Sequence, residues 1–182
     1  MNNTNNQLIA TRYAKSLIGL ANEGGLNYGV LHQNLQNVKE ILSLTSELYD
    51  TLCNPVISIN DKEDLIGCIF ANDTDETIRN FLKLLVKENR FNLIYEIIKI
   101  YDNMLDKINN ISKVEVLSAI ELDDNLKEQI KNKLGEILKK EIIVNYNTDK
   151  SIMAGLVYKM GDNIFDTSLK GKLDKFKKAI LK

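Results

Sequence analysis

The chain contains few of the residues that interrupt helices or cross-link small folds. Its 182 residues include one proline, nine glycines, two cysteines, one histidine and no tryptophan. A single proline leaves room for long uninterrupted helices. Two cysteines cannot form a disulfide scaffold, and the glycine and proline content is too low for a collagen-like or low-complexity chain. Because 44% of the residues are hydrophobic, the composition indicates an ordinary globular protein.

The chain also has no excess of either charge. Lysine and arginine total 24, aspartate and glutamate total 25, and the net charge is −1. This balance gives no overall field that would attract nucleic acid or a membrane surface. The local exception is residues 167–182, which hold six lysines and one aspartate. If these residues form a helix, one possible function is that of a nucleic-acid-binding or adaptor module that uses its basic face. The absence of arginine from this segment instead favours lysines that only face solvent.

Targeting and membrane-spanning segments are not apparent. Residues 1–6 have neither the basic nor the apolar region of a secretory signal, and no window of 18 apolar residues occurs. The cysteines, Cys53 and Cys68, stand in apolar sequence, and we expect both to be free, buried thiols. The sequence therefore predicts a soluble protein that is not secreted.

The first 108 residues have the periodicity of helices. Apolar residues recur at spacings of three and four, most regularly from Ile94 to Ile108. We expect five helices, with start signals at Thr4, Asn60 and Thr74 and with the second helix running to about Leu48. Residues 1–108 are thus predicted to form an all-helical bundle.

The period changes after Asn109-Asn110. Alternating apolar residues predict strands at residues 113–120 and 142–146, with a helix at 122–138 between them. A third strand at 152–160, a short strand at 164–166 and a final helix would complete a β-α-β-β-β-α unit. The predicted fold class is mainly α, with an N-terminal all-helical bundle followed by a small α+β C-terminal domain at residues 110–182.

Motifs of catalysis are missing from the sequence. The single histidine, His32, excludes multi-histidine metal sites, and no P-loop, nucleophile-elbow or dinucleotide-binding motif occurs. Asp123 and Asp124 precede a predicted helix, where the helix dipole explains two acidic residues better than a bound cation does. We expect no catalytic residue, cofactor or metal, and an enzyme acting on a small molecule is an alternative without supporting geometry. The residues alone indicate a two-domain module that binds other proteins through grooves between helices.

Several short motifs make this interpretation more specific. In the bundle they are Ala10-x-Arg12-Tyr13-Ala14-x-x-Leu17, Leu52-x-Asn54-Pro55-x-Ile57, and Asn80-Phe81-Leu82-x-Leu84-Leu85 followed by Asn89-Arg90. In the second domain they are Val114-x-Val116-x-Ser118-Ala119 and a stretch from Asp149 to Leu181 with Gly155, a Gly-Asp turn, Asp166-x-Ser168 and a basic helix through Leu173. In this order and spacing, over about residues 8–181, the set resembles the delta subunit family of F-type ATP synthase, which includes the mitochondrial oligomycin-sensitivity-conferring protein.

The resemblance implies a stator subunit of a proton-translocating ATP synthase, with no chemistry of its own. In this family the helical bundle binds the N-terminal segments of the alpha subunits of the catalytic head. The C-terminal domain binds subunit b of the peripheral stalk, so that rotation is coupled to ATP synthesis. The resemblance also implies a place at the cytoplasmic face of the bacterial plasma membrane, indirect membrane association through the complex, and no nucleic-acid partner.

Partner contacts are expected at residues of these motifs. In the bundle they are Arg12, Tyr13, Ala14, Leu17, Phe81, Leu82, Leu85 and Arg90, and in the C-terminal domain they are Gly155, Asp166, Ser168 and Leu173. The candidates for a groove wall are Tyr13, Leu17, Phe81 and Leu85, with plain bundle core as the alternative for each of them. Arg12 is expected either at the rim of the groove or facing water. For Asp166 and Ser168, capping of the final helix is favoured over contact with subunit b.

Overall fold

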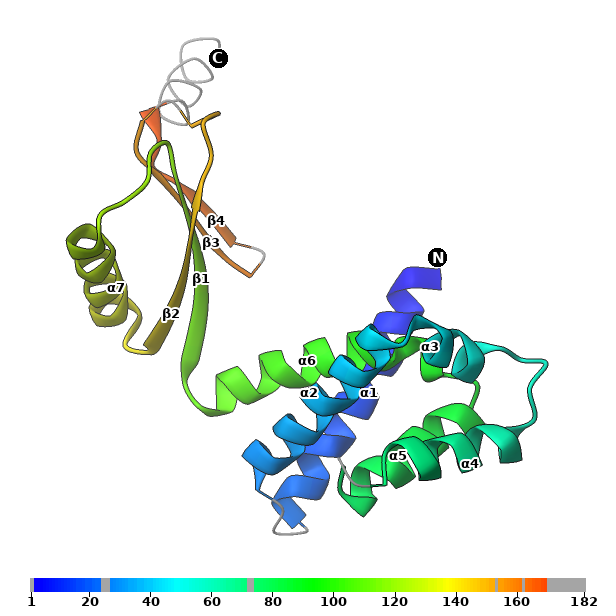
Figure 1. Cartoon of the computed structure of the whole chain (residues 1–182). Coiled ribbons are helices and arrows are strands. Elements are labelled where there is room, and N and C mark those ends of the chain that lie inside the picture. Colours follow the sequence, from blue (N-terminus) through cyan, green and yellow to red (C-terminus); the bar gives the residue numbers. More distant parts are fainter. Residues whose placement is uncertain (1, 24–26, 72–73, 153, 162, 170–182) are drawn as a thin grey trace. The chain divides into compact units, whose positions relative to one another are not determined.

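The chain divides into two compact units, Met1–Leu105 and Asp106–Lys182. The computed structural model describes residues 2–23, 27–71, 74–152, 154–161 and 163–169 (Figure 1). Within these ranges, the first unit contains helices and no strand, and the second contains the sheet. This is the predicted fold class, and it is confirmed. Among the described residues, no helix is both long and apolar enough to cross a membrane.

The first unit is a bundle of six α-helices with one turn of 3₁₀ helix (Figure 1). They are α1 (Asn2–Glu23), α2 (Tyr28–Leu44), α3 (Ser46–Cys53), α4 (Ile59–Ile69), α5 (Glu76–Lys87), the 3₁₀ turn (Phe91–Leu93) and α6 (Ile94–Ile108). Each helix buries an apolar stripe; α1 contributes Ala10, Ala14 and Leu17, all without solvent exposure. Small alanines on α1 allow neighbouring helices to approach closely, so this stripe forms a tightly packed core.

Helix boundaries differ from the sequence prediction at several points. The predicted second helix is two helices, because Thr45 adopts φ −128° and ψ 82° and separates α2 from α3. The apolar period continues across this break, so periodicity could not reveal it. α1 already begins at Asn2, so Thr4 lies inside the helix rather than at its start.

Two further start signals were also misplaced. Ser58, rather than Asn60, caps α4, since its Oγ accepts a hydrogen bond from the Asp61 backbone N–H. The residue before α5 is Asp75, and the Thr74 hydroxyl instead donates to the Phe70 carbonyl oxygen at 2.9 Å. Several polar residues adjacent to a helix start can take the cap position, and the sequence does not show which of them adopts the extended backbone of a cap.

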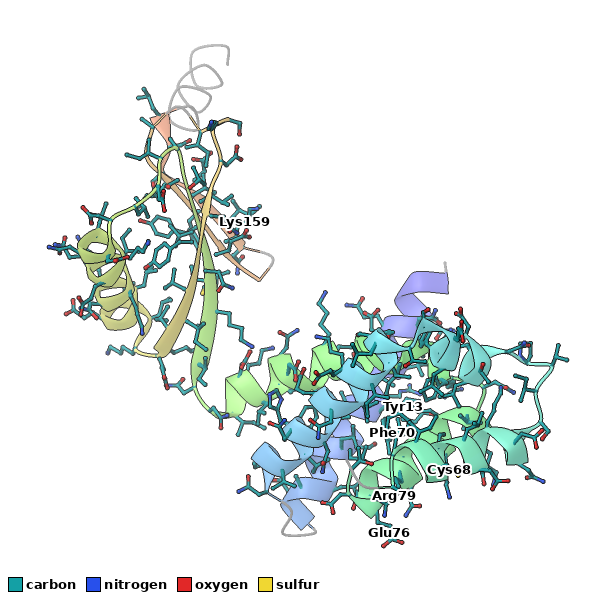
Figure 2. All side chains as sticks on the ribbon, in the orientation of Figure 1. Tyr13, Cys68, Phe70, Glu76, Arg79 and Lys159 are labelled. Carbon is teal, nitrogen blue, oxygen red and sulfur yellow. The ribbon has the colours of Figure 1, made fainter. Side chains whose placement is uncertain are left out.

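The prediction for the cysteines was wrong for Cys68 and only partly right for Cys53. Both thiols are free, but Cys68 is exposed on α4 (Figure 2). Cys53 is half-buried at the end of α3. Burial raises the pKa of the Cys53 thiol. Apolar neighbours in the sequence do not fix which face of a helix a residue occupies, and Cys68 lies on the outer face.

In its described residues, the second unit is a four-stranded sheet with one helix on its face (Figure 1). Its elements are β1 (Ile111–Ser118), α7 (Asp124–Leu138), β2 (Glu141–Thr148), β3 (Leu156–Met160) and β4 (Asn163–Asp166). The strand order is β2-β1-β3-β4; β1 and β2 are parallel, and the other pairs are antiparallel. This confirms the predicted order of elements as far as Asp166, whereas the predicted final helix lies mostly in residues 170–182, outside the described residues.

The parallel strands β1 and β2 are connected by α7, and this β-α-β unit encloses a small core. Val114, Val116 and Ile142 are buried beneath Ile130 and Leu134 of α7. The Asp123 side chain caps α7 by accepting a hydrogen bond from the Leu126 N–H at 2.6 Å. This confirms that the acidic pair Asp123-Asp124 belongs to a helix start.

A candidate protein-binding face on the helical bundle

The structure brings together three of the predicted partner-binding residues: Tyr13 on α1, Phe81 on α5 and Arg90 just after α5. The Tyr13 and Phe81 rings are in edge contact, with centroids 6.1 Å apart and an interplanar angle of 69°. The Arg90 guanidinium carbon lies 5.9 Å from the centre of the Tyr13 ring, and its Nη1 is 3.4 Å from the Tyr13 hydroxyl oxygen. Aromatic edge contacts and cation–π contacts of this kind fix side chains in place. Tyr13, labelled in Figure 2, thus connects α1 with α5.

Burial divides the predicted residues into two groups. Ala14, Leu17, Leu82 and Leu85 have no solvent exposure, so they belong to the core beneath this region. Phe81 is 7% exposed, Tyr13 and Arg90 are half-buried, and Arg12 is exposed. Only the second group reaches the surface of this unit, and the first group holds it in position.

Other surface residues of this region were not selected from the sequence. Leu20 on α1 is 46% exposed and Leu84 on α5 is 44% exposed. Ile9, Tyr13, Ser16 and Leu20 are spaced by four, three and four residues, so they form a second stripe beside the buried stripe of α1. On α5, Phe81 and Leu84 are three residues apart, and Leu84 likewise lies beside the buried stripe of its helix. The signal was therefore present, as a partly apolar stripe next to the core stripe.

We call this surface the α1–α5 face. It consists of Ile9, Arg12, Tyr13, Ser16 and Leu20 of α1, Phe81 and Leu84 of α5, and Arg90. A pocket of about 370 Å³ opens at its arginine end, lined by Asn5, Ile9, Arg12, Tyr13, Ser16 and Arg90. Exposed leucines beside fixed aromatic rings provide what a docked amphipathic helix needs, namely apolar anchor points on a pre-formed surface.

Three of the predicted residues of the C-terminal domain, Gly155, Asp166 and Ser168, also come together, through contacts that involve the backbone. Gly155 has φ +96°, and a Cβ atom there would lie 2.9 Å from the Ser168 Cα. The Ser168 N–H donates to Asp166 Oδ1 at 2.8 Å, and the Leu169 N–H donates to the Ala154 carbonyl oxygen at 2.8 Å. These contacts hold the chain after β4 against the segment before β3. Leu173 lies outside the described residues.

A second candidate surface lies between α7 and the sheet. An apolar pocket of about 220 Å³ is lined by Val114, Leu134, Ile137, Leu138, Tyr158, Met160 and Phe165. Ile137 is 69% exposed and Phe165 is 56% exposed. Burial raises the pKa of Tyr158 in its wall. Two large apolar side chains at the mouth of an apolar pocket mark a surface that can bind a partner.

Groups able to perform chemistry are scarce in the described part of the chain. It contains no cluster of three histidine, cysteine, aspartate or glutamate side chains that could hold a metal ion. His32 Nδ1 lies 3.1 Å from Asp102 Oδ1, and Gln36 Nε2 donates to the same carboxylate. The histidine thus takes part in a polar contact between α2 and α6, which explains it without catalysis.

Comparisons with known proteins agree with the architecture. A family model described as ATP synthase delta (OSCP) subunit matches residues 9–180. The chloroplastic ATP synthase subunit delta of Galdieria sulphuraria is 35% identical over 170 residues, covering 93% of this chain and 96% of the relative. The ATP synthase subunit delta of Desulfotalea psychrophila is 32% identical over 174 residues, covering 95% of this chain and 96% of the relative.

A solved structure shares the fold. A chain of the Toxoplasma gondii mitochondrial ATP synthase hexamer superimposes with a TM-score of 0.73 at 17% identity. The match covers 95% of this chain and 97% of that chain. The similarity therefore includes both units.

Proposed function

The chain belongs to the ATP synthase delta (OSCP) subunit family and is a stator component of an ATP synthase, and from this premise we propose that it is a non-catalytic link between the catalytic head and the peripheral stalk. The scarcity of reactive groups in the described residues fits such a role. A stator must resist the torque of the rotor, so the link has to bind two partners and release neither during many turnovers.

We assign the head-binding role to the bundle, through the α1–α5 face. The proposed ligand is the N-terminal segment of an alpha subunit, bound as an amphipathic helix. The observation that supports this assignment is the exposure of Leu20 on α1 and of Leu84 on α5, the two helices that the Tyr13–Phe81 contact connects. Anchors of this kind dominate the binding energy of helix-in-groove complexes.

We assign the stalk-binding role to the second unit. The proposed ligand is subunit b, and the apolar pocket between α7 and the sheet supports the assignment because Ile137 and Phe165 are exposed at its mouth. A peripheral position at the cytoplasmic face of a bacterial plasma membrane follows from the same proposal, with membrane association arising only through the complex. The nucleic-acid-binding alternative depends on residues 170–182, which lie outside the described residues.

Slow release sets the affinity that such a link requires. A dissociation constant of 1 μM corresponds to about −8.2 kcal/mol and one of 1 nM to about −12.3 kcal/mol, and differences in affinity arise mostly from the off-rate. A stationary link therefore needs binding near the nanomolar end. Two separate contacts to the head and the stalk add to the retention of the whole assembly.

The test of the head-binding assignment is the substitution Leu84→Asp. We expect it to weaken binding of an alpha N-terminal peptide by at least about tenfold, because a carboxylate would replace an apolar anchor of about 1.4 kcal/mol or more. The measurement is a calorimetric titration of the full chain with the peptide. The matched control is Leu44→Asp at the end of α2, where the leucine is 78% exposed and outside the face. Equal affinities for the two variants would contradict the assignment.

A further inference from the structure

Arginine is rare in this chain, and its distribution is uneven. The chain has 24 lysines and arginines, of which only Arg12, Arg79 and Arg90 are arginine. Arg79 has a structural use, since its Nη1 donates to the Ala71 carbonyl oxygen at 3.1 Å and to that of Thr74, at the start of α5 (Figure 2). The other two arginines line one pocket, the one at the end of the α1–α5 face.

This pocket holds two positive charges that the described residues do not balance. Its lining residues are Asn5, Ile9, Arg12, Tyr13, Ser16 and Arg90, and none of them carries a carboxylate. Within the described ranges, the ion pairs involve a histidine and lysines, and neither Arg12 nor Arg90 has an acidic partner. Such a pocket attracts an anion. The half-buried side chains of Ile9 and Tyr13 form its apolar wall.

The Arg90 guanidinium is already held in place. Its Nη1 contacts the Tyr13 hydroxyl at 3.4 Å and its carbon lies 5.9 Å from the centre of that ring. Because a guanidinium has five N–H donors, most of them remain free to bind a ligand. A pre-positioned guanidinium loses little side-chain entropy on binding and suits a planar anion that accepts two hydrogen bonds.

We propose that the pocket binds the carboxylate of an aspartate or glutamate on the partner helix that docks on the α1–α5 face. This inference rests on the proposed function of that face. Arg12 and Arg90 would hold the carboxylate, while Leu84 and Leu20 contact the apolar residues of the same helix. Since the pocket includes Asn5 and Ile9, the acidic residue lies at the end of the face formed by the first half of α1. The charge contact thereby fixes the direction of the partner helix and excludes helices with a lysine at that position.

The experiment is a double-mutant cycle between the full chain and an alpha N-terminal peptide. In a set of peptides, each aspartate is replaced by asparagine or each glutamate by glutamine, one at a time. We expect one amide peptide to bind the unaltered chain about tenfold more weakly, as the loss of a hydrogen-bonded charge pair would produce. The variants Arg12→Gln and Arg90→Gln should each bind the original peptide more weakly than the unaltered chain does. Each variant should bind the original peptide and that amide peptide with the same affinity.

Lys15→Gln is the matched control, because Lys15 is an exposed cation on the same helix that does not line the pocket. It should preserve the full difference between the two peptides. If every amide peptide bound as tightly as the original, or if Lys15→Gln behaved like Arg90→Gln, the carboxylate contact would be disproved while the head-binding role stood. If the original peptide did not bind at all, the proposed function of the face would fail instead.

Discussion

At the residue scale, Gly155 shows how one backbone position holds a segment of the second unit. Its φ of +96° is unfavourable for any residue with a Cβ atom, and the Ser168 Cα occupies the space that such an atom would need. The Leu169 N–H to Ala154 carbonyl bond depends on this close approach. The chain after β4 is therefore held to the segment before β3 by the absence of a side chain.

Gly155→Ala should accordingly destabilise the protein by about 1–3 kcal/mol, because the new methyl group strains the backbone and displaces Ser168. Urea unfolding followed by circular dichroism measures the change. Gly67→Ala on α4 is the control, since a Cβ there meets no atom within 4 Å, and helix propensity predicts a gain of about 0.5–1 kcal/mol. A loss of stability for Gly67→Ala equal to that of Gly155→Ala would contradict this explanation.

Two tyrosines in the bundle should make its stability depend on pH in the alkaline range. Burial raises the pKa of Tyr49 and of Tyr101 from 10.0 to about 12. The folded state favours the neutral phenols, so their contribution is fully present below pH 10 and is lost as the pH rises through about 12. The free energy of unfolding measured from pH 9 to pH 12 should therefore fall, and Tyr101→Phe should reduce the fall. A profile that is flat above pH 10 would contradict the assignment of these phenols.

At the element scale, the positions of helices could be predicted from the sequence more reliably than their ends. Apolar spacing identified the core faces of α1 and α5, because burial requires that spacing whatever the neighbours are. It could not show the break at Thr45, where the chain bends without interrupting the apolar pattern. The caps depend on which of several adjacent polar residues bends the backbone, and this is decided by packing between helices.

The α1–α5 face illustrates the same limit for function. Tyr13, Phe81 and Arg90 could be predicted because they belong to motifs, and the structure brings them into contact. Leu20 and Leu84 stand in the partly apolar stripes beside the core stripes, but the sequence does not show that they are exposed, since exposure depends on what packs beside each helix. Motifs therefore predict which residues meet, while the exposed part of a surface requires the three-dimensional structure.

The cap of α7 offers a test at this scale. Asp123→Ala should cost about 0.5–2 kcal/mol, because it removes the acceptor of the Leu126 N–H and a negative charge at the helix start. Asp123→Asn keeps a side-chain oxygen and should lose much less. Thermal unfolding of the two variants separates these values. Equal losses would show that the charge, rather than the hydrogen bond, stabilises the start of α7.

At the scale of the whole molecule, the two units suit a link between two different partners. The bundle presents exposed leucines beside aromatic rings and arginines, whereas the second unit presents an apolar pocket beside its helix. Each unit has a core of its own, so each can be fixed to a separate neighbour. Family membership identifies the assembly, and the surfaces indicate where the chain would bind to it.

The most direct test of this account is ATP-driven ion pumping by membranes stripped of the catalytic head and then recombined with purified head. With this chain present, we expect the head to bind firmly and ATP hydrolysis to drive pumping. Without it, the isolated head should hydrolyse ATP at an unchanged rate but drive little pumping, and Leu84→Asp should restore pumping less effectively than Leu44→Asp. Equal pumping with and without the chain, or ATP hydrolysis by the chain alone, would contradict the role that we propose, a non-catalytic link.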